Sequence, residues 1–208
     1  MPSYKFTYFS ARGAGETSRL LFAAAGVEYE DVRVTHPQWP VLKPTMPFGQ
    51  LPVLEVDDGE PMPQSRAIEN YLAREFGLYG SDSWETATID VVNETAREFK
   101  PMFASLFHAK TPEAKKELVT DLSENLAPKL FGHLEKYLKK NNGGEGWFVG
   151  NSMSYADLVT FAVMENVVGT ITEDVALKNF PKLRGHFKRV ASQERIATWL
   201  EKRPVTQF

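Results

Sequence analysis

Few residue types in this chain of 208 residues are suited to chemistry. Cysteine is absent, which excludes disulfides, thiolate metal sites and a cysteine nucleophile, so sulfur chemistry would need a sulfur that a ligand brings. The histidines lack the paired spacing of metal ligands, and we predict no metal ion. They are His36, His108, His133 and His186.

Tyr8 is the residue whose position raises a chemical question. Tyr4, Phe6 and Tyr8 alternate with polar residues, as in a strand with one buried face, and a loop with Arg12 and Gly13 follows directly. From this pattern alone, Tyr8 is either the last core residue of its strand or a hydroxyl delivered to a site.

The elements that would position Tyr8 alternate between strand and helix. Strand 4–8, helix 15–25 with Gly26 as its stop, and strand 27–34 form a βαβ unit. The tyrosine therefore ends the first strand of that unit.

A hairpin and a helix complete the first domain. The hairpin joins strand 53–56 to a short returning strand that ends near Met62, and helix 65–76 stops at Gly77. The order βαβ then ββα predicts an α/β domain over residues 1–77, with a mixed four-stranded sheet flanked by helices.

The rest of the chain is predicted to be an all-α bundle domain over 84–208, after a linker over 78–83. Ser154 and Asp157 have the spacing of a capping box for a helix over 155–168. Because that helix is apolar on nearly every side, it should be the buried central helix. Asp157 is therefore interpreted as structural.

Two other helices in this half contain proline. Apolar spacing predicts helices over 92–106 and 118–138, and Pro101 and Pro128 should kink them.

The composition excludes two classes of function. Hydrophobic residues make up 42% of the chain and charged residues 25%, and the net charge is −3 with a pI of about 5.9, so no basic footprint for nucleic acid is present. The longest apolar run, 20–27, is far shorter than the ~20 residues that span a bilayer, and the start has no signal pattern. We expect a cytoplasmic protein with no membrane partner.

A proline before the third strand makes the first domain resemble the thioredoxin-like fold. By that resemblance the Leu51–Pro52 bond would be cis, and the backbone of Leu51 would face a ligand; a trans proline at the start of an ordinary strand is the alternative. Redox members of that fold act through two cysteines, which this chain lacks.

Five segments carry a more specific resemblance. They are YKFTYFSARG, DVRVTHPQWPVLKPTMPFGQLPVLEVDDG, PQSRAIENYLAREFGL, GWFVGNSMSYADL and KRPVTQF. In this order they resemble the cytosolic glutathione transferases of the sigma class, a family that includes conjugating enzymes, glutathione-dependent prostaglandin D synthases and lens crystallins. The resemblance covers nearly the whole chain. It implies a homodimeric enzyme that binds glutathione on the first domain and an electrophile against the second.

The resemblance implies that Tyr8 donates a hydrogen bond to the glutathione sulfur. A free thiol with a pKa of about 8.5 is only ~3% thiolate at pH 7, and the thiolate is the nucleophile. Lowering that pKa by about two units takes about 2.7 kcal/mol. A hydrogen bond to a charged group contributes roughly 1.5–3 kcal/mol, so one hydroxyl is sufficient.

The resemblance also assigns the other glutathione contacts on this sheet. Gln64 and Ser65, the latter a predicted N-cap, would bind the γ-glutamyl carboxylate at the positive end of a helix, with plain capping as the alternative. Leu51, beside Pro52, would pair its backbone with the cysteinyl backbone like an added strand.

The glycyl end and the dimer partner involve four further positions. Lys43 would act by charge and Trp39 by its indole N–H, unless Trp39 only packs on a neighbouring loop. Gln50 stands where many relatives have lysine, which removes one charge contact. Glu98 matches an acidic residue that reaches the γ-glutamyl ammonium in the other subunit, with a solvated helix charge as the alternative.

Ala14 departs from the family pattern. Sigma enzymes commonly have an arginine at this position, two residues after the one that matches Arg12. That charge lies near the thiolate in relatives, so its loss would weaken sulfur activation or widen the substrate pocket.

By family position, the electrophile pocket is apolar and suits varied hydrophobic electrophiles. Its residues are Phe9, Ala11, Gly13 and Ala14 on the first domain and Phe103, Ser105, Val159, Val163 and Phe208 on the second. The apolar ones are equally candidates for the core. Ser105 and Val159 replace aromatic residues of the prostaglandin-synthase branch, which disfavours that activity.

Three functions stay open. The first is an enzyme that conjugates glutathione, its co-substrate, to hydrophobic electrophiles with Tyr8 as the catalytic residue. The second is a structural lens crystallin with little catalysis, which Ala14 favours mildly, and the third is a carrier of hydrophobic ligands. The set of matching glutathione contacts favours the enzyme.

Overall fold

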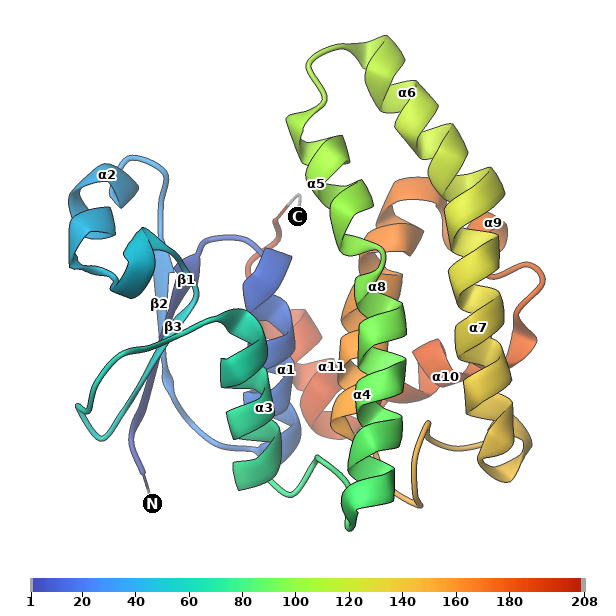
Figure 1. Cartoon of the computed structure of the whole chain (residues 1–208), viewed down its shortest axis with the longest axis horizontal. Coiled ribbons are helices and arrows are strands. Elements are labelled where there is room, and N and C mark those ends of the chain that lie inside the picture. The colour runs from blue at the N-terminus through green and yellow to red at the C-terminus, as the bar shows by residue number, and fades with distance from the viewer. Residues whose placement is uncertain (1, 207–208) are drawn as a thin grey trace. The chain divides into compact units, whose positions relative to one another are not determined.

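A computed structural model describes residues 2–206 of the chain, and the predicted pocket residue Phe208 lies outside the described residues. The chain forms two compact units (Figure 1). The first joins the residues up to Leu78 with those from Gln193 onward, and the second covers Tyr79–Ser192.

The first unit contains the predicted mixed sheet. Its strands are β1 (Tyr4–Phe9), β2 (Glu30–Val34), β3 (Val53–Val56) and β4 (Met62–Pro63), in the spatial order β2-β1-β3-β4. β1 runs parallel to β2 and antiparallel to β3, and β3 pairs antiparallel with β4. This topology confirms the βαβ-ββα prediction and the thioredoxin-like fold.

β2 is shorter than predicted at its start. Gly26 adopts the left-handed conformation at the end of the preceding helix, with φ of 67°, as its position predicts. The N–H of Val27 then closes the helix end on the carbonyl of Phe22 at 3.1 Å. The residues directly after Gly26 therefore belong to the helix cap and the connection, and pairing with β1 begins only at Glu30.

Helices lie on both faces of the sheet. α1 (Glu16–Ala25) and α3 (Ser65–Glu75) lie on one face and the short α2 (Trp39–Leu42) on the other (Figure 1). α1 contacts α3 and also α11 (Glu194–Lys202), which returns from the C-terminal end of the chain to this unit. Leu20, Leu21 and Phe22 of α1 are fully buried.

The second unit is helical throughout. Its longer helices are α4 (Ser83–Arg97), α5 (Lys100–His108), α6 (Pro112–Asp121), α7 (Ala127–Lys140), α8 (Tyr155–Ile171) and α10 (Pro181–Ala191), with the short α9 (Glu173–Ala176) between the last two. α8 packs on α4, and all of its residues from Tyr155 to Ala162 are buried. This confirms the prediction of a buried central helix.

The two prolines lie in different helical settings. The helix expected over 92–106 is two helices, because α4 ends at Arg97 and Pro101 occupies the first turn of α5, where a missing N–H costs nothing. Pro128 lies in a helical run that continues from α6 through a π-helical segment over Leu122–Leu126 into α7. Pro101 therefore marks the start of a separate helix, whereas Pro128 follows a π-helical irregularity within a continuous one.

The capping box is confirmed. The carboxylate of Asp157 accepts hydrogen bonds from the N–H of Ser154 at 2.7 Å and from its hydroxyl at 2.8 Å. It also accepts one from the N–H of Phe148 at 2.9 Å and lies 2.8 Å from Nε2 of His186. Asp157 and His186 are fully buried, so this carboxylate joins three segments of the second unit.

Candidate active site

Tyr8 lies near the end of β1, under a tight turn that closes on its ring. The turn is the 3₁₀ segment Gly13–Gly15, and within it the N–H of Ala14 donates to the Tyr8 hydroxyl oxygen at 2.9 Å. A Cβ on Gly13, where φ is +37°, would lie 2.6 Å from that oxygen, and one on Gly15 would lie 2.5 Å from Cδ1 of the ring. The two glycines thus permit the close approach.

The environment of Tyr8 keeps its hydroxyl protonated. Burial raises the pKa of Tyr8, while the Ala14 N–H and the positive charge of Arg19 act in the opposite direction to a smaller extent. Because the oxygen accepts from Ala14, the hydroxyl proton is left to be donated to a different acceptor. Tyr8 is therefore equipped as a hydrogen-bond donor.

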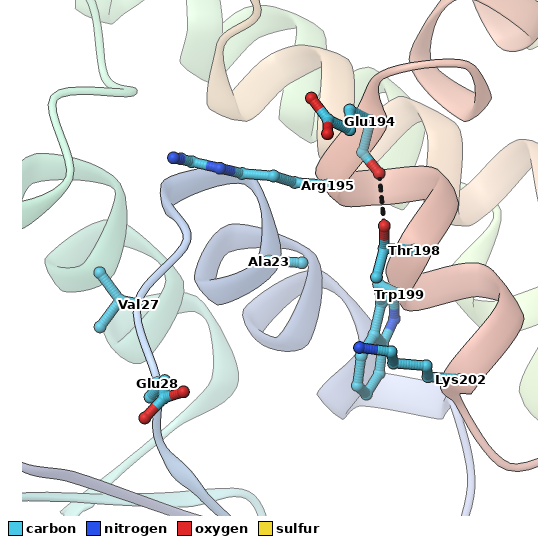
Figure 2. A pocket seen from close by; sticks show the side chains of 8 residues that line it. All are labelled: Ala23, Val27, Glu28, Glu194, Arg195, Thr198, Trp199 and Lys202. Carbon is cyan, nitrogen blue, oxygen red and sulfur yellow. Dashed lines mark hydrogen bonds between the residues drawn. The ribbon is translucent and has the colours of Figure 1, made fainter.

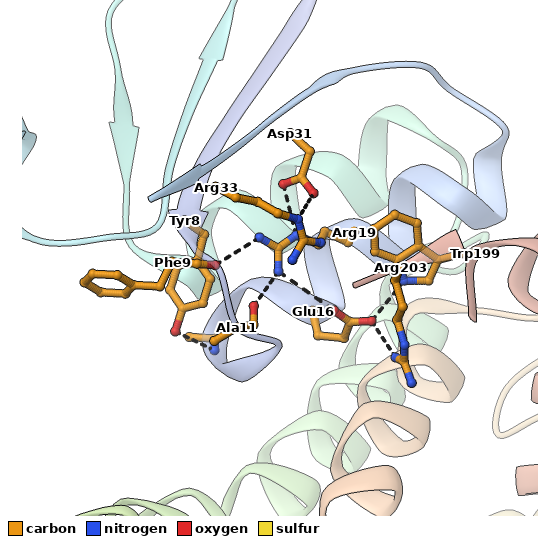
Figure 3. A network of polar contacts seen from close by, with 10 residues as sticks. Tyr8, Phe9, Ala11, Glu16, Arg19, Asp31, Arg33, Trp199 and Arg203 are labelled. Carbon is orange, nitrogen blue, oxygen red and sulfur yellow. Dashed lines mark hydrogen bonds and ion pairs between the residues drawn. The ribbon is translucent and has the colours of Figure 1, made fainter. Parts of the chain in front are cut away.

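Arg19, which no sequence pattern singled out, holds the segment between the end of β1 and the turn. Its guanidinium is completely buried and donates to the carbonyls of Ala11 at 2.6 Å and Phe9 at 3.3 Å (Figure 3). It also donates to Asp31 at 3.1 Å, and its Cζ lies 5.7 Å from the centroid of the Tyr8 ring. No sequence pattern flagged it, because a charged residue on a helix is expected to be exposed.

The proline before β3 has the predicted geometry. The Leu51–Pro52 peptide bond is cis, which confirms that prediction. Pro52 is buried and Leu51 is half-buried.

The start of α3 requires one correction. Ser65 was predicted as the N-cap, but Gln64 occupies that position and Ser65 is the first helical residue. Gln64 has φ of 77° and ψ of 106°, a conformation that is rare for a residue with a Cβ and that concentrates at functional sites. Its carbonyl begins the helix by accepting from Ile68 at 3.0 Å. The first-turn N–H groups have no intrahelical partner.

The segment after β2 contains the residues that were predicted to hold the glycyl end, a role that stays a prediction. Trp39 is half-buried, with its ring edge-to-face on Phe9 at a centroid distance of 5.2 Å. Lys43 and Gln50 are exposed. The Lys43 side chain passes over Gly49, whose Cβ would lie 3.5 Å from the Lys43 Cε.

The remaining predicted residues belong to the second unit. Glu98 is exposed at the end of α4. Phe103 of α5 stacks on Phe99 at a centroid distance of 6.2 Å, and Ser105 is exposed. In α8, Val159 is buried and Val163 is half-buried.

A groove of the first unit lies away from these residues. It measures about 570 Å³ between α1 and α11, and no predicted site residue lines it (Figure 2). Over residues 2–206, no group of three or more His, Asp or Glu side chains is arranged so that it could bind a metal ion. Within the same range, every helix is too short or too polar to cross a membrane.

The fold and the tyrosine site define a thioredoxin-like protein with a helical second unit. Residues 4–74 match the family described as "Glutathione S-transferase, N-terminal domain", and residues 97–203 match "Glutathione S-transferase, C-terminal domain". The chain belongs to the glutathione S-transferase family, as its five segments indicated.

Individual relatives cover essentially the whole chain. It is 40% identical to "Probable glutathione S-transferase 5" of Caenorhabditis elegans over 100% of both chains, and 37% identical to "S-crystallin SL11" of Nototodarus sloanii, also over 100% of both. It is 41% identical to "Hematopoietic prostaglandin D synthase" of Gallus gallus over 99% of each. The structure titled "Fasciola hepatica sigma class GST" superimposes with a TM-score of 0.89 at 32% identity, covering 100% of this chain and 99% of that one.

Proposed function

We propose that this chain is a sigma-class glutathione transferase in which the Tyr8 hydroxyl stabilises the glutathione thiolate. The proposal rests on one observation. The N–H of Ala14 donates a hydrogen bond to the Tyr8 hydroxyl oxygen at 2.9 Å, so the hydroxyl can donate its own proton to another acceptor. A thiolate sulfur is the acceptor that this family's co-substrate supplies. The raised pKa of Tyr8 supports the same role, because a donor must keep its proton at neutral pH.

The proposed reaction is addition of the thiolate to a hydrophobic electrophile. Glutathione loses its thiol proton to solvent, and the sulfur forms a bond to the electrophilic carbon. With a chlorinated nitroaromatic, the chlorine leaves as chloride. Tyr8 holds the sulfur in its charged form and releases it as the new bond removes the negative charge.

The other contacts would orient the tripeptide. We assign the γ-glutamyl carboxylate to Gln64 and the first turn of α3, because first-turn N–H groups are not used within the helix and the helix dipole attracts an anion there. The backbone of Leu51 would pair with the cysteinyl residue, and Trp39, Lys43 and Gln50 would hold the glycyl end. This orientation converts a bimolecular attack into a positioned one.

We further propose a cytoplasmic homodimer, with Glu98 of one subunit directed at the γ-glutamyl ammonium in the other. The proposal includes the electrophile-binding residues that the family resemblance implies, which are Phe9, Ala11, Gly13, Ala14, Phe103, Ser105, Val159, Val163 and Phe208.

A structural role is the second candidate, and Ala14 is the observation that favours it. The missing arginine removes a positive charge beside the proposed thiolate, and a chain with 37% identity to this one is named as an S-crystallin. A ligand carrier or a prostaglandin D isomerase would keep the same fold, since function depends on the site and not on the fold.

Conjugation of glutathione to a chlorinated nitroaromatic separates these functions. The enzyme proposal expects saturable turnover that falls by about 10–100-fold in Tyr8→Phe, the loss typical of one hydrogen bond to a charged group, with glutathione binding retained. Normal binding with negligible turnover in the unmodified protein would favour the crystallin or carrier function instead.

A further inference from the structure

A chain of polar contacts connects the C-terminal helix α11 to the turn over Tyr8, entirely within the first unit (Figure 3). It begins at Glu16, a carboxylate in the first turn of α1 that is only 3% exposed. One oxygen of Glu16 accepts from the indole N–H of Trp199 at 2.9 Å and from the guanidinium of Arg203 at 2.7 Å. These partners are 183 and 187 residues away in the sequence.

The other Glu16 oxygen faces Arg19. It lies 3.9 Å from Nη1, the same nitrogen that donates to the Ala11 carbonyl. A buried guanidinium is stable only when it is paired and hydrogen-bonded, and Glu16 and Asp31 supply the two opposite charges. Glu16 therefore supplies a counter-charge beside Arg19, while the hydrogen bonds to the Phe9 and Ala11 carbonyls orient the guanidinium.

Those two carbonyls flank the residue that leads out of β1 into the turn. By fixing them, Arg19 sets where the turn crosses the Tyr8 ring and hence where the Ala14 N–H meets the hydroxyl. The Arg19 charge, 5.7 Å from the ring centroid, also favours donation of the hydroxyl proton.

We propose that Arg19 is a positioning residue for Tyr8 and that Glu16, Trp199 and Arg203 hold it there, which makes α11 part of the thiolate-stabilising site. In its catalytic consequence the inference rests on the proposed function. As a statement about the position of Tyr8, it is testable without glutathione.

A second contact of α11 provides the control. Arg195 donates to the carbonyls of Ala24 at 3.2 Å and Ala25 at 2.8 Å, and so attaches α11 to the other end of α1. Arg195→Met removes a guanidinium that docks the same helix without touching Glu16 or Arg19. A role of α11 in stability alone would make Arg195→Met and Arg203→Met equivalent.

The first measurement is amide hydrogen exchange at Ala14 in the ligand-free protein. We expect Arg203→Met and Glu16→Gln to accelerate exchange at Ala14 by about tenfold, since one lost hydrogen bond contributes about that factor, while Arg195→Met leaves it unchanged. Arg203→Met is the primary variant because it lies at the far end of the chain of contacts and leaves the buried Arg19 in place. Equal acceleration in Arg203→Met and Arg195→Met would overturn the proposal.

The second measurement is the pKa of the bound glutathione thiol, from the ultraviolet absorbance of the thiolate. We expect Arg203→Met and Arg19→Lys to raise this thiol pKa by up to about one unit, which makes the thiolate fraction near neutral pH about tenfold smaller. Arg195→Met should leave the thiol pKa unchanged. A bound thiol in the unmodified protein with the pKa of free glutathione would refute the proposed function, and exchange at Ala14 would still decide the positioning role. If the bound thiol has a pKa below that of free glutathione and this pKa is the same in Arg203→Met, the positioning role of the Glu16, Trp199 and Arg203 contacts is refuted while the proposed function stands.

Discussion

The backbone N–H of Ala14 lies 2.9 Å from the hydroxyl oxygen of Tyr8, so a backbone group and not a side chain fixes the orientation of this hydroxyl. The identity of residue 14 therefore has no direct effect on that contact. What the alanine removes is the positive charge that relatives are expected to place beside the sulfur.

Restoring that charge should strengthen thiol activation. In Ala14→Arg the N–H donor stays and a cation is added near the proposed thiolate, so we expect the bound-thiol pKa to fall and kcat/KM below pH 7 to rise about two- to tenfold. Steady-state kinetics across pH tests this, with Ala14→Met as the control for size. Equal gains in both variants would attribute the effect to packing and not to charge.

Gly13 should be intolerant of a side chain. In Gly13→Ala the new Cβ would lie 2.6 Å from the Tyr8 oxygen at a φ of +37°, so the turn or the ring must move. We expect turnover to fall at least about tenfold, as for loss of one hydrogen bond. Gly143→Ala is the matched control, because Gly143 also has positive φ, +61°, but nothing within 4 Å of its Cβ.

The control should lose only stability, about 1 kcal/mol, because the added Cβ is strained in the left-handed region. Chemical denaturation of both variants beside the conjugation assay separates the two effects. If Gly13→Ala keeps full turnover, the turn does not position Tyr8.

The sheet and the end of β1 could be predicted from the sequence because their signals are local. Tyr4, Phe6 and Tyr8 show the period of a strand, and Gly26 and the Ser154–Asp157 spacing mark helix ends by residue type. These elements are present in the structure. The roles of the site residues stay predictions.

The parts of the site that sequence reasoning missed depend on backbone groups and distant contacts. The Ala14 N–H has no side-chain signature, and the left-handed φ of Gln64 contradicts the preference of its residue type. Glu16 and Arg19 have the residue types of a solvated helix face, yet both are buried. Glu16 is covered because α11 returns to it from the C-terminal end, and Arg19 lies against Asp31 and the end of β1. Burial decided by such long-range contacts is not visible in local spacing.

Asp157 should matter for stability and not for chemistry. Asp157→Ala leaves the buried donors of Ser154, Phe148 and His186 without an acceptor, so we expect a loss of about 3–5 kcal/mol in the free energy of unfolding. Urea denaturation measures it. Asp82→Ala is the control: this exposed N-cap accepts from Trp84 and Glu85, and its loss should cost only about 1 kcal/mol.

A loss of about 1 kcal/mol in both variants would show that the Asp157 site rearranges or admits water. Unchanged glutathione affinity per folded molecule in Asp157→Ala is expected in either case.

Tyr29 should make the protein sensitive to alkali. Burial raises the pKa of Tyr29 well above its ordinary value, and its buried hydroxyl has no hydrogen-bond partner among the described residues. In the unfolded chain Tyr29 ionises with a pKa of about 10, whereas in the folded protein it ionises only at a higher pH. The neutral Tyr29 therefore makes its full contribution to the free energy of unfolding below about pH 10, and this contribution is lost as the pH rises further. Stability should therefore fall above about pH 10.

Tyr29→Phe should remove part of that dependence. The ring can keep its stack on Phe22, at a centroid distance of 4.1 Å, so stability at neutral pH should be unchanged or higher by about 1 kcal/mol. Tyr155→Phe is the contrast, since the Tyr155 hydroxyl accepts from Arg97 at 2.6 Å and its loss should cost about 1–3 kcal/mol. Thermal unfolding from pH 7 to 11 compares them, and a destabilised Tyr29→Phe at neutral pH would contradict the assignment.

Stabilisation of a bound thiolate by the Tyr8 hydroxyl can be measured directly. The most direct measurement is the pKa of the glutathione thiol in complex with the unmodified protein and with Tyr8→Phe, read from thiolate absorbance at saturating protein. We predict a bound-thiol pKa about two units below the free value of about 8.5. In Tyr8→Phe this pKa should rise most of the way back to the free value, while the protein still binds glutathione through its peptide groups. A bound-thiol pKa that is equally low in both proteins would contradict it and would assign thiol activation to other groups.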